Sequence, residues 1–254
     1  MTLMRRLVVC LDVRDGRVVK GTRFVNLRDV GDPIELAAQY EAEGADEIVF
    51  LDISASTERR GTLLDVARRT AERLFIPLTI GGGVRSAEDV AQVLRAGADK
   101  VAINSAAVLR PEVLSDAAAL FGAQCVVSSI DAKLVDGSWR VFTHGGKVAT
   151  DIDAIDWARE CVRRGAGEIL LTSVNRDGSR SGYDIELTRA VADAVDVPVI
   201  ASGGAGSAQD VVAAIEEGHA DAALVAGILH DGTVTVAKLK EQMREARLPV
   251  RNAA

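Results

Sequence analysis

The chain has 254 residues, of which 48% are hydrophobic and 26% are charged, and its formal net charge at pH 7 is −7. This length and apolar content suit one large domain, or two small ones, with a sizeable buried core. Nucleic acids and membrane surfaces are anionic, so the acidic balance argues against both as partners. No window approaches the roughly 20 apolar residues that a membrane span needs, and we expect a soluble, cytoplasmic protein.

Cysteine and histidine follow no pattern of a disulfide framework or a metal site. The cysteines are far apart in apolar or helical runs, and the histidines lack the paired spacing of zinc ligands. These residues are Cys10, Cys125, Cys161, His144, His219 and His230. We expect reduced core thiols and neither a metal nor another cofactor.

Short apolar runs rich in β-branched residues alternate with longer segments of helical period. The predicted strands are 6–12, 47–53, 76–82, 100–105, 125–131, 168–174, 197–203 and 222–227. The predicted helices are 33–44, 63–74, 86–97, 111–122, 154–165, 185–195, 207–218 and 235–246. Eight such units in about 250 residues predict a single α/β domain, a (β/α)8 TIM barrel over 1–254. A doubly wound open sheet is the competing fold, and we expect 251–254 to be disordered.

The sequence repeats itself at an offset of 121 residues. Pro77, Gly82, Gly83, Ser86 and Asp89 meet identical residues, which are Pro198, Gly203, Gly204, Ser207 and Asp210. An internal repeat of this length predicts two similar half-barrels, at about 1–122 and 123–250.

Glycine-rich turns follow the third and seventh predicted strands, at Gly83 and Gly204. Glycine lets a ligand approach the backbone, and the free N–H groups of the next helix favour an anion. Other small or polar residues follow the fourth, sixth and eighth strands: Asn104, Ser105, Asp177, Gly178, Ala226 and Gly227. We predict one phosphate site in each half, and hence an elongated ligand with a phosphate at each end. The alternative is tight turns with Ser86 and Ser207 as helix caps.

Two carboxylates end opposed strands of the predicted ring. Asp12 ends strand one and Asp131 ends strand five, so they face each other between the two phosphate sites. An acid and a base in these positions can move protons at two substrate atoms, and an apolar setting raises their pKa values. The alternative is that either aspartate caps a loop or pairs with Lys20 or Lys133. Asp52, which ends strand two, is a weaker catalytic candidate, and we expect it to support a loop instead.

The segment between the first strand and the first helix, 13–32, is too long for an ordinary connection. Long loops over a barrel mouth are often lids. Lys20 in this segment is either a cation that reaches the substrate or a solvated lid residue.

Several motifs in order over almost the whole chain resemble one family. They include "CLDVRDGRVVKG", "FLDISAS", "GGGVRS", "ADKVAINSAAV", "SIDAK", "NRDGSRSGYD" and "PVIASGGAG". This set is similar to the cyclase subunits of imidazole glycerol phosphate synthase, of histidine biosynthesis. A related isomerase of the same pathway shares the half-barrel repeat and the paired aspartates, and is the nearest rival. The other rivals are a non-catalytic barrel that activates a glutaminase and a phosphate-binding barrel for another sugar metabolite.

The resemblance implies a reaction on a bisphosphorylated ribulosyl-formimino aminoimidazole carboxamide ribonucleotide. Ammonia adds, an imidazole ring closes, and a C–N bond breaks to give imidazole glycerol phosphate and aminoimidazole carboxamide ribonucleotide. It implies that Asp12 and Asp131 are the general acid and base and that Lys20 belongs to a mobile loop. It assigns Gly83, Asn104 and Ser105 to one phosphate site. The other site takes Asp177, Gly178, Ser202, Gly204, Ala226 and Gly227.

The resemblance also implies a glutaminase subunit at the N-terminal face of the barrel, which supplies ammonia through the barrel. Four charged residues at strand starts, Arg6, Glu47, Lys100 and Glu168, match the ring at that entrance. Asp99 matches a contact to the partner. Apart from the resemblance, a structural salt-bridge cluster is the favoured interpretation of the four charges.

Four positions depart from the family pattern. Ser128 and Ser129 stand where small apolar residues are expected, Asn175 where an acid is expected, and Gly227 where a serine is expected. The missing hydroxyl at Gly227 is expected to weaken the second phosphate site without abolishing it, because the backbone amide remains.

Overall fold

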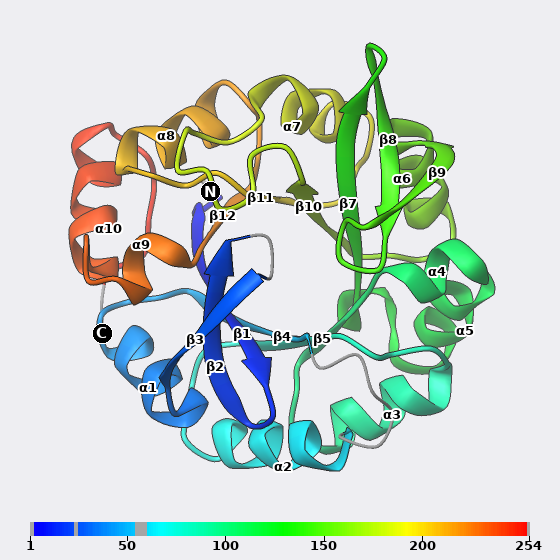
Figure 1. Cartoon of the computed structure of the whole chain (residues 1–254), viewed down its shortest axis with the longest axis horizontal. Helices are drawn as coiled ribbons and strands as arrows, with labels where there is room; N and C mark the ends of the chain where they lie inside the picture. Colours follow the sequence, from blue (N-terminus) through cyan, green and yellow to red (C-terminus); the bar gives the residue numbers. More distant parts are fainter. Residues whose placement is uncertain (1–2, 23–24, 54–59, 253–254) are drawn as a thin grey trace.

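A computed structural model describes residues 3–22, 25–53 and 60–252 of the chain. Eight parallel strands form a closed ring: β1 (Arg6–Arg14), β4 (Glu47–Asp52), β5 (Leu78–Gly81), β6 (Lys100–Ile103), β7 (Val126–Val135), β10 (Glu168–Ser173), β11 (Val199–Ser202) and β12 (Ala222–Val225). They follow this order around the ring, and β12 pairs back with β1 (Figure 1). The predicted (β/α)8 barrel is therefore confirmed, and the open sheet is excluded.

Helices surround this ring on its outer side (Figure 1). They are α1 (Pro33–Ala42), α2 (Arg60–Ala71), α3 (Ala87–Arg95), α5 (Glu112–Phe121), α6 (Ala154–Arg163), α7 (Ile185–Ala192), α8 (Ala208–Glu216) and α10 (Val236–Glu245). Side-chain caps fix several first turns, because the oxygen of Asp32, Asp153 or Thr235 accepts a free N–H of the next turn. No helix of the described segments is long and apolar enough to cross a membrane.

Three short helical segments were not predicted. They are α4 (Ser105–Leu109), the 3-10 turn η2 (Ala123–Cys125) and α9 (Gly227–His230). Segments of three to five residues are too short to show a helical period, so the sequence gives no signal for them. Of the C-terminal residues expected to be disordered, 253–254 lie outside the described residues, and 251–252 are exposed and without regular structure.

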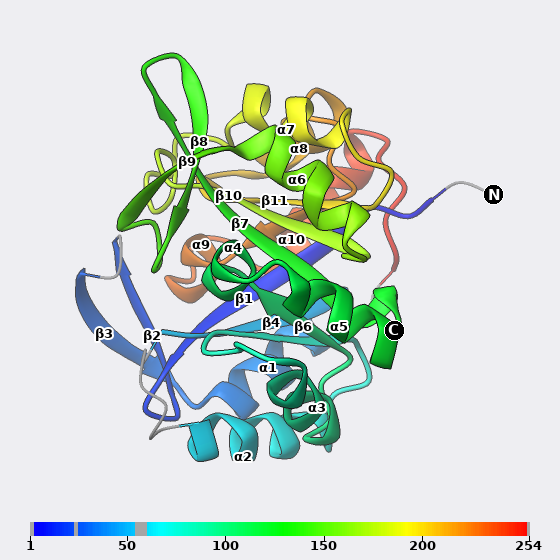
Figure 2. The ribbon, with the colours of Figure 1, turned by 90° about the vertical axis from the view of Figure 1, so that its right-hand side faces the viewer.

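Two antiparallel extensions rise from the barrel at one face. The strands β2 (Arg17–Thr22) and β3 (Val25–Gly31) follow β1, and β8 (Ser138–Thr143) and β9 (Val148–Asp153) follow β7. Both extensions lie at the face opposite the two chain termini (Figure 2). The interpretation of the segment after Asp12 as a loop was wrong in this respect, because most of it is paired β-structure.

The same two-residue turn starts each extension. Asp15 and Gly16 join β1 to β2, and Asp136 and Gly137 join β7 to β8. All four residues have positive φ, between 48° and 80°. Asp-Gly turns of this kind match the twist of the flanking strands and start hairpins. They recur at the offset of 121 residues that relates the two halves of the sequence.

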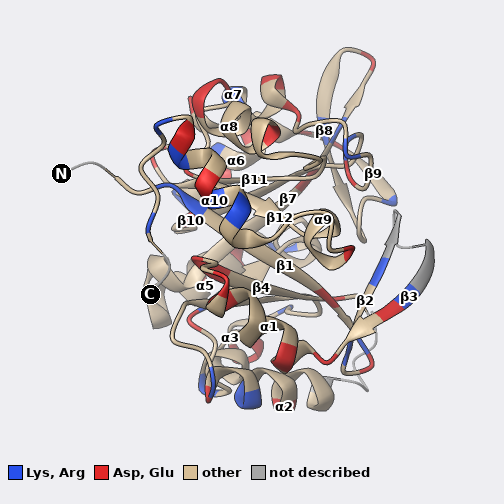
Figure 3. Cartoon of the chain, turned by 90° about the vertical axis from the view of Figure 1, so that its left-hand side faces the viewer, with Lys and Arg blue, Asp and Glu red and all other residues tan. Residues whose placement is uncertain are grey.

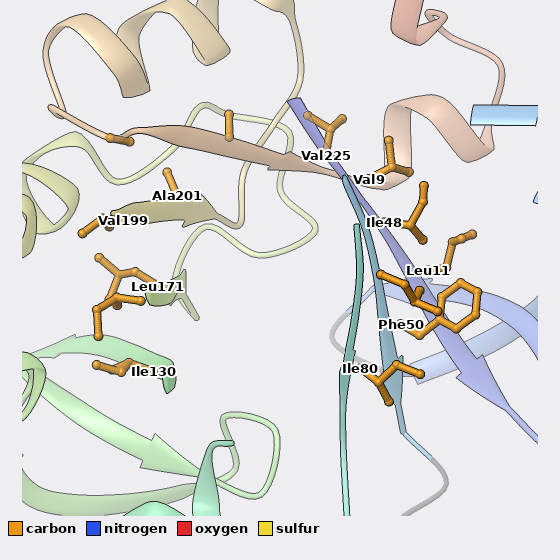
Figure 4. Packing of buried hydrophobic residues seen from close by; sticks show 14 of the residues in the cluster. Val9, Leu11, Ile48, Phe50, Ile80, Ile130, Leu171, Val199, Ala201 and Val225 are labelled. Atoms are coloured by element: carbon orange, nitrogen blue, oxygen red, sulfur yellow. The ribbon is translucent and has the colours of Figure 1, made fainter. Parts of the chain in front are cut away.

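The core has two layers because side chains alternate along each strand. Leu7, Val9 and Leu11 of β1 pack outward against the helices, with Phe50 and Ile80 of neighbouring strands (Figure 4). The intervening residues point into the barrel and form a second cluster: Val8, Cys10, Val49, Ala102, Val127, Leu170, Ile200, Ala222 and Leu224. The barrel interior is therefore packed, and functional groups are left at its two ends.

A buried lysine joins the last helix to the first strand. Lys240 of α10 is 1% exposed, and its ammonium donates to Gly44 O at 2.7 Å and to Asp46 Oδ1 at 2.8 Å. The other carboxylate oxygen of Asp46 accepts the N–H of Leu7 at 2.8 Å. One ion pair thus connects α10, the turn after α1 and the start of β1.

Lys240→Met is expected to lower the free energy of unfolding by about 3 kcal/mol, because it leaves the Asp46 carboxylate buried without its counter-ion. The matched control is Lys238→Met on the same helix, whose partner Glu241 is half exposed. That change should cost less than about 0.5 kcal/mol. Urea denaturation of the two variants tests this, and equal stabilities would contradict the role given to Lys240.

Candidate functional site

Asp12 and Asp131 face the mouth of the barrel from opposite sides. β1 and β7 are four strands apart in either direction around the ring. Each aspartate is an even number of residues beyond an interior side chain, Val8 in β1 and Val127 in β7, so both point inward. Both are partly buried, just above the packed interior.

Burial raises the pKa of both carboxyl groups. The pKa of Asp12 rises to about 7, first through burial and then through the nearby charge of Asp177. Burial also raises the pKa of Asp131, to about 6, and the charge of Asp177 adds to this rise. Hydrogen bonds from the Asn104 side chain and the Gly146 backbone act in the opposite direction and lower the pKa. A carboxyl pair with such values holds one proton near neutral pH, as proton transfer in both directions requires.

Neither aspartate is neutralised by a lysine in the described segments. The ammonium of Lys20 donates to Gly227 O at 2.8 Å and to the carboxylate of Asp231. Lys133 lies over the ring of Phe142, 5.6 Å from its centre. The alternative interpretation of Asp12 and Asp131 as structural ion pairs with these lysines is therefore wrong.

Asp177 is a third carboxylate of this mouth. It lies in the turn after β10, where its own N–H donates to Ser173 O at 2.9 Å. Its charge raises the pKa of both Asp12 and Asp131. Asp177 is thus close to the two opposed acids, and its backbone N–H is already bonded within the turn.

The first glycine-rich turn is shaped by a close approach of two backbones. Gly82 has φ of 100°, and a Cβ atom there would lie 2.3 Å from Asp52 O. This places Asp52 under the turn, as expected for a loop-supporting residue. Gly83 follows with φ of 67°. The Ser86 side chain accepts Asp89 N at 3.2 Å and caps α3.

Asn104 and Ser105 lie beside this turn, at the end of β6 and the start of α4. The Ser105 hydroxyl accepts the N–H of His144 at 2.9 Å, so it ties the β8–β9 turn to the site. The side-chain amide of Asn104 bonds to Asp131, while its Oδ1 is buried without a partner in the described part of the chain. Asn104 was assigned to phosphate binding alone, and it also orients an acid.

The second glycine-rich turn repeats the contact of the first. A Cβ atom on Gly203 would lie 2.8 Å from Ser173 O, which corresponds to the Gly82–Asp52 contact at the offset of 121 residues. Gly204 has φ of 109°, and its added Cβ would lie 2.2 Å from Gly182 O. The Ser207 side chain accepts Asp210 N at 3.3 Å and caps α8. The caps of the alternative interpretation are therefore present, but they do not account for the glycines.

The remaining residues of the predicted second phosphate site lie at the same rim. Ser202 ends β11, and its neighbour in the ladder is Thr172 of β10. Gly178 lies in the turn after β10 with φ of 71°. Ala226 and Gly227 lie at the start of α9. The structure thus brings these four residues and Gly204 to adjoining strand ends.

A closed ring of four charges lies at the opposite end of the barrel. Arg6 donates to Glu47 at 3.0 Å and also to Glu168, and Lys100 donates to the same two carboxylates at 2.9 and 2.8 Å. The two cations and two anions alternate around the barrel axis. Asp99 lies just before Lys100 at this face, is exposed, and accepts Leu78 N at 2.8 Å through Oδ2.

The sequence interpretation missed contributions from three residues. Gly146 of the β8–β9 turn donates to Asp131. Arg180 and Asp231 form an ion pair beside Lys20. All three contacts join segments distant in sequence, so the contacts themselves leave no local pattern. The Asp-Gly turn at Asp136 was the one available signal, since it predicts the hairpin that leads to Gly146.

The departures at residues 128, 129 and 175 are accommodated without disrupting the sheet. β7 pairs with β6 and β10 on both sides through Ser128, and with β10 at Ser129. The Asn175 side-chain oxygen accepts Leu134 N at 2.9 Å. An amide oxygen accepts this bond as a carboxylate would, so the change of residue preserves the contact.

No group of three or more His, Cys, Asp or Glu in the described ranges has an arrangement that could hold a metal ion. Figure 3 shows acidic and basic residues interspersed over the face it presents, without a continuous basic band.

Asp12→Asn is expected to raise the free energy of unfolding at pH 8 by roughly 1–3 kcal/mol. Burial raises the pKa of Asp12 from 3.8 to about 7, so the folded protein keeps a proton that the unfolded chain loses. Stability is therefore lost as pH rises from about 4 to about 7, and Asn removes that loss. At pH 4 the variant and the original should agree within about 0.5 kcal/mol.

Asp151→Asn on the exposed part of β9 is the matched control, and it should change little at either pH. Denaturation at pH 4 and pH 8 provides the comparison. If Asp12→Asn raised the free energy of unfolding equally at both pH values, the carboxyl group would not titrate as described.

Comparison with known proteins gives the same family over nearly the whole chain. A sequence model of the family described as "Histidine biosynthesis protein" matches residues 6–235. The chain is 68% identical over 250 residues to "Imidazole glycerol phosphate synthase subunit HisF" of Myxococcus xanthus, a match that covers 98% of this chain and 99% of the relative. The chain belongs to the histidine biosynthesis protein family.

Proposed function

We propose that the chain is the cyclase subunit of an imidazole glycerol phosphate synthase and acts in histidine biosynthesis. The observation that carries this proposal is the opposed pair of Asp12 and Asp131, each with a raised pKa, between two glycine-rich turns. Its relative from Myxococcus xanthus bears the name of a subunit of this enzyme. In this reaction ammonia adds to the bisphosphorylated ribulosyl-formimino nucleotide, the imidazole ring closes, and a C–N bond breaks.

The two carboxyl groups act as the general acid and the general base of these steps. Addition of ammonia leaves a nitrogen that must lose a proton, and C–N cleavage leaves an amine that must gain one. Between about pH 6 and pH 7 the pair holds one proton, so a donor and an acceptor are present together. Asp177 supports this state, because its negative charge opposes ionisation of both groups.

One phosphate binds at Gly83, Asn104 and Ser105, and the other at Gly178, Ser202, Gly204, Ala226 and Gly227. Glycine at these strand ends lets a phosphate approach the backbone closely, and backbone N–H groups favour an anion. Asp177 contributes differently from the rest of the second set. Its N–H is bonded to Ser173 O and its carboxylate repels a phosphate, so it acts beside the reacting ring.

The ammonia comes from a glutaminase subunit bound at the N-terminal face. The ring of Arg6, Glu47, Lys100 and Glu168 closes the barrel axis there, at the entrance that ammonia would use. Phe75 at this face is 95% exposed and Leu3 is 66% exposed, so both offer apolar surface to a partner. Asp99 is exposed beside them and suits a cation of the partner.

Turnover with ammonium salt and no glutaminase tests the proposed activity. Asp12→Asn and Asp131→Asn are each expected to lower kcat at least about 100-fold, because each removes one proton-transfer group. Asp151→Asn should retain kcat within about twofold. Product is followed as imidazole glycerol phosphate, and rates are normalised to free ammonia. The proposal would be contradicted if both variants turned over at the wild-type rate. It would also be contradicted if the wild-type chain rearranged the substrate without closing the ring.

Phe75→Asp and Asp99→Lys test the docking face. Each is expected to weaken binding of the glutaminase subunit about tenfold or more, because hot-spot contacts of this kind carry much of an interface. The ratio of glutamine-driven to ammonium-driven turnover should fall in parallel. Leu134→Asp, an equally polar change on the exposed extension at the opposite face, is the control. If only Leu134→Asp lost binding, the partner would bind at the opposite face, and the proposed docking face would be contradicted.

A further inference from the structure

Three cations meet one carboxylate at the rim of the second phosphate site. Lys20 of β2, Arg28 of β3 and Arg180 of the turn between β10 and α7 all pair with Asp231, the residue that follows α9. The Lys20 ammonium also donates to Gly227 O at 2.8 Å. We call these four side chains the Asp231 cluster. Its members come from three separate parts of the chain, so the fold itself assembles it.

The backbone holds Arg180 next to the second glycine-rich turn. Arg180 has φ of 55°, a conformation that non-glycine residues rarely adopt. A Cβ atom added to Gly206 would lie only 2.3 Å from the carbonyl oxygen of Arg180. The next turn is fixed by a hydrogen bond from Gly182 N to Gly204 O of 2.9 Å. The position of Arg180 is therefore built by the same glycines that form the site.

The guanidinium of Arg180 borders the space left by the missing side chain of Gly227. A Cβ atom on Gly227 would lie 3.9 Å from Arg180 Nη2 and 3.6 Å from Lys20 Nζ. This is the position at which the family resemblance leads us to expect a serine hydroxyl. In this chain two cations occupy the neighbourhood of that hydroxyl.

The charges of the cluster do not balance. Three cations and one carboxylate leave an excess of two positive charges, whereas the ring of four charges at the other face is neutral. The pKa of Asp231 falls to about 2, first through its hydrogen bond with Lys20, so it is a full anion at neutral pH. A phosphate carries about −1.5 to −2 charges at pH 7, which matches the excess.

We propose that Arg180 binds the substrate phosphate at the second glycine-rich turn, and that Asp231 is the resting partner of Arg180 and Lys20 that the phosphate displaces. This inference rests on the proposed function, because it concerns the phosphate held by Gly204 and Gly227. The guanidinium supplies charge-assisted hydrogen bonds in place of the absent hydroxyl. Asp231 competes with the phosphate for the same two cations.

Binding of glycerol 3-phosphate to the purified chain, measured by calorimetry, tests the proposal without turnover. Arg180→Gln is expected to weaken binding about tenfold or more, the scale of one charge-assisted hydrogen bond. Arg180→Lys should restore much of the affinity, because it keeps the charge. Asp231→Asn should bind at least as tightly as wild type, since a competing anion is removed. Arg17→Gln is the matched control, because it removes an arginine paired with Asp29 on the same two strands, and it should change affinity less than twofold.

Ammonium-driven turnover adds a second readout. Arg180→Gln should raise KM for the bisphosphorylated substrate about tenfold and change kcat less than threefold. If Arg180 only braced the β2 and β3 strands through Asp231, then Asp231→Asn would weaken phosphate binding as Arg180→Gln does. That result, or wild-type affinity in Arg180→Gln, overturns the inference. A wild-type chain that binds glycerol 3-phosphate but does not turn over would instead contradict the proposed function.

Discussion

The parallel pairing of β12 with β1 is the constraint on which the site depends. This ladder closes the ring, and ring closure alone puts β1 opposite β7. In an open sheet the same sequence would place Asp12 and Asp131 on strands that never face each other. The alternation of side chains then sends Leu7 and Leu11 outward and Asp12 inward. Ring closure and the alternation of side chains together therefore produce an acid pair across a common mouth.

Repetition gives the mouth its symmetry, and the differences between the halves give it direction. Gly82 and Gly203 make the same close approach to the preceding strand end, and Asp-Gly turns start an extension in each half. The halves differ in the side chains that surround these turns. Asp52 ends β4 where Ser173 ends β10, and the Asp231 cluster has no counterpart that the sequence repeat predicts. A symmetrical scaffold thus carries two glycine-rich turns whose neighbouring side chains differ.

The sequence predicted the barrel because each strand and helix is long enough to show its own period. All eight parallel strands and all eight of the longer helices were expected near their observed positions. The extensions were missed because the Asp-Gly pairs that start them were not interpreted as hairpin turns. The opposed positions of Asp12 and Asp131 followed from the order of the strands, which the alternation of strand and helix patterns along the sequence reveals. The roles of Gly146, Arg180 and Asp231 could not follow, because each depends on contacts between segments that only the folded chain brings together.

The distribution of charge along the barrel axis explains how one scaffold holds two kinds of site. At the N-terminal end every cation of the ring has two carboxylate neighbours, so burial leaves no net charge and the ring stays closed and rigid. At the mouth, burial and the nearby charge of Asp177 raise the pKa values of Asp12 and Asp131, which keeps a proton in the site. The positive excess lies to one side, at Asp231. In the proposed function, this positive excess attracts the anionic substrate and the raised pKa values keep a proton on the acid pair, so binding and proton transfer use opposite charges in adjacent places.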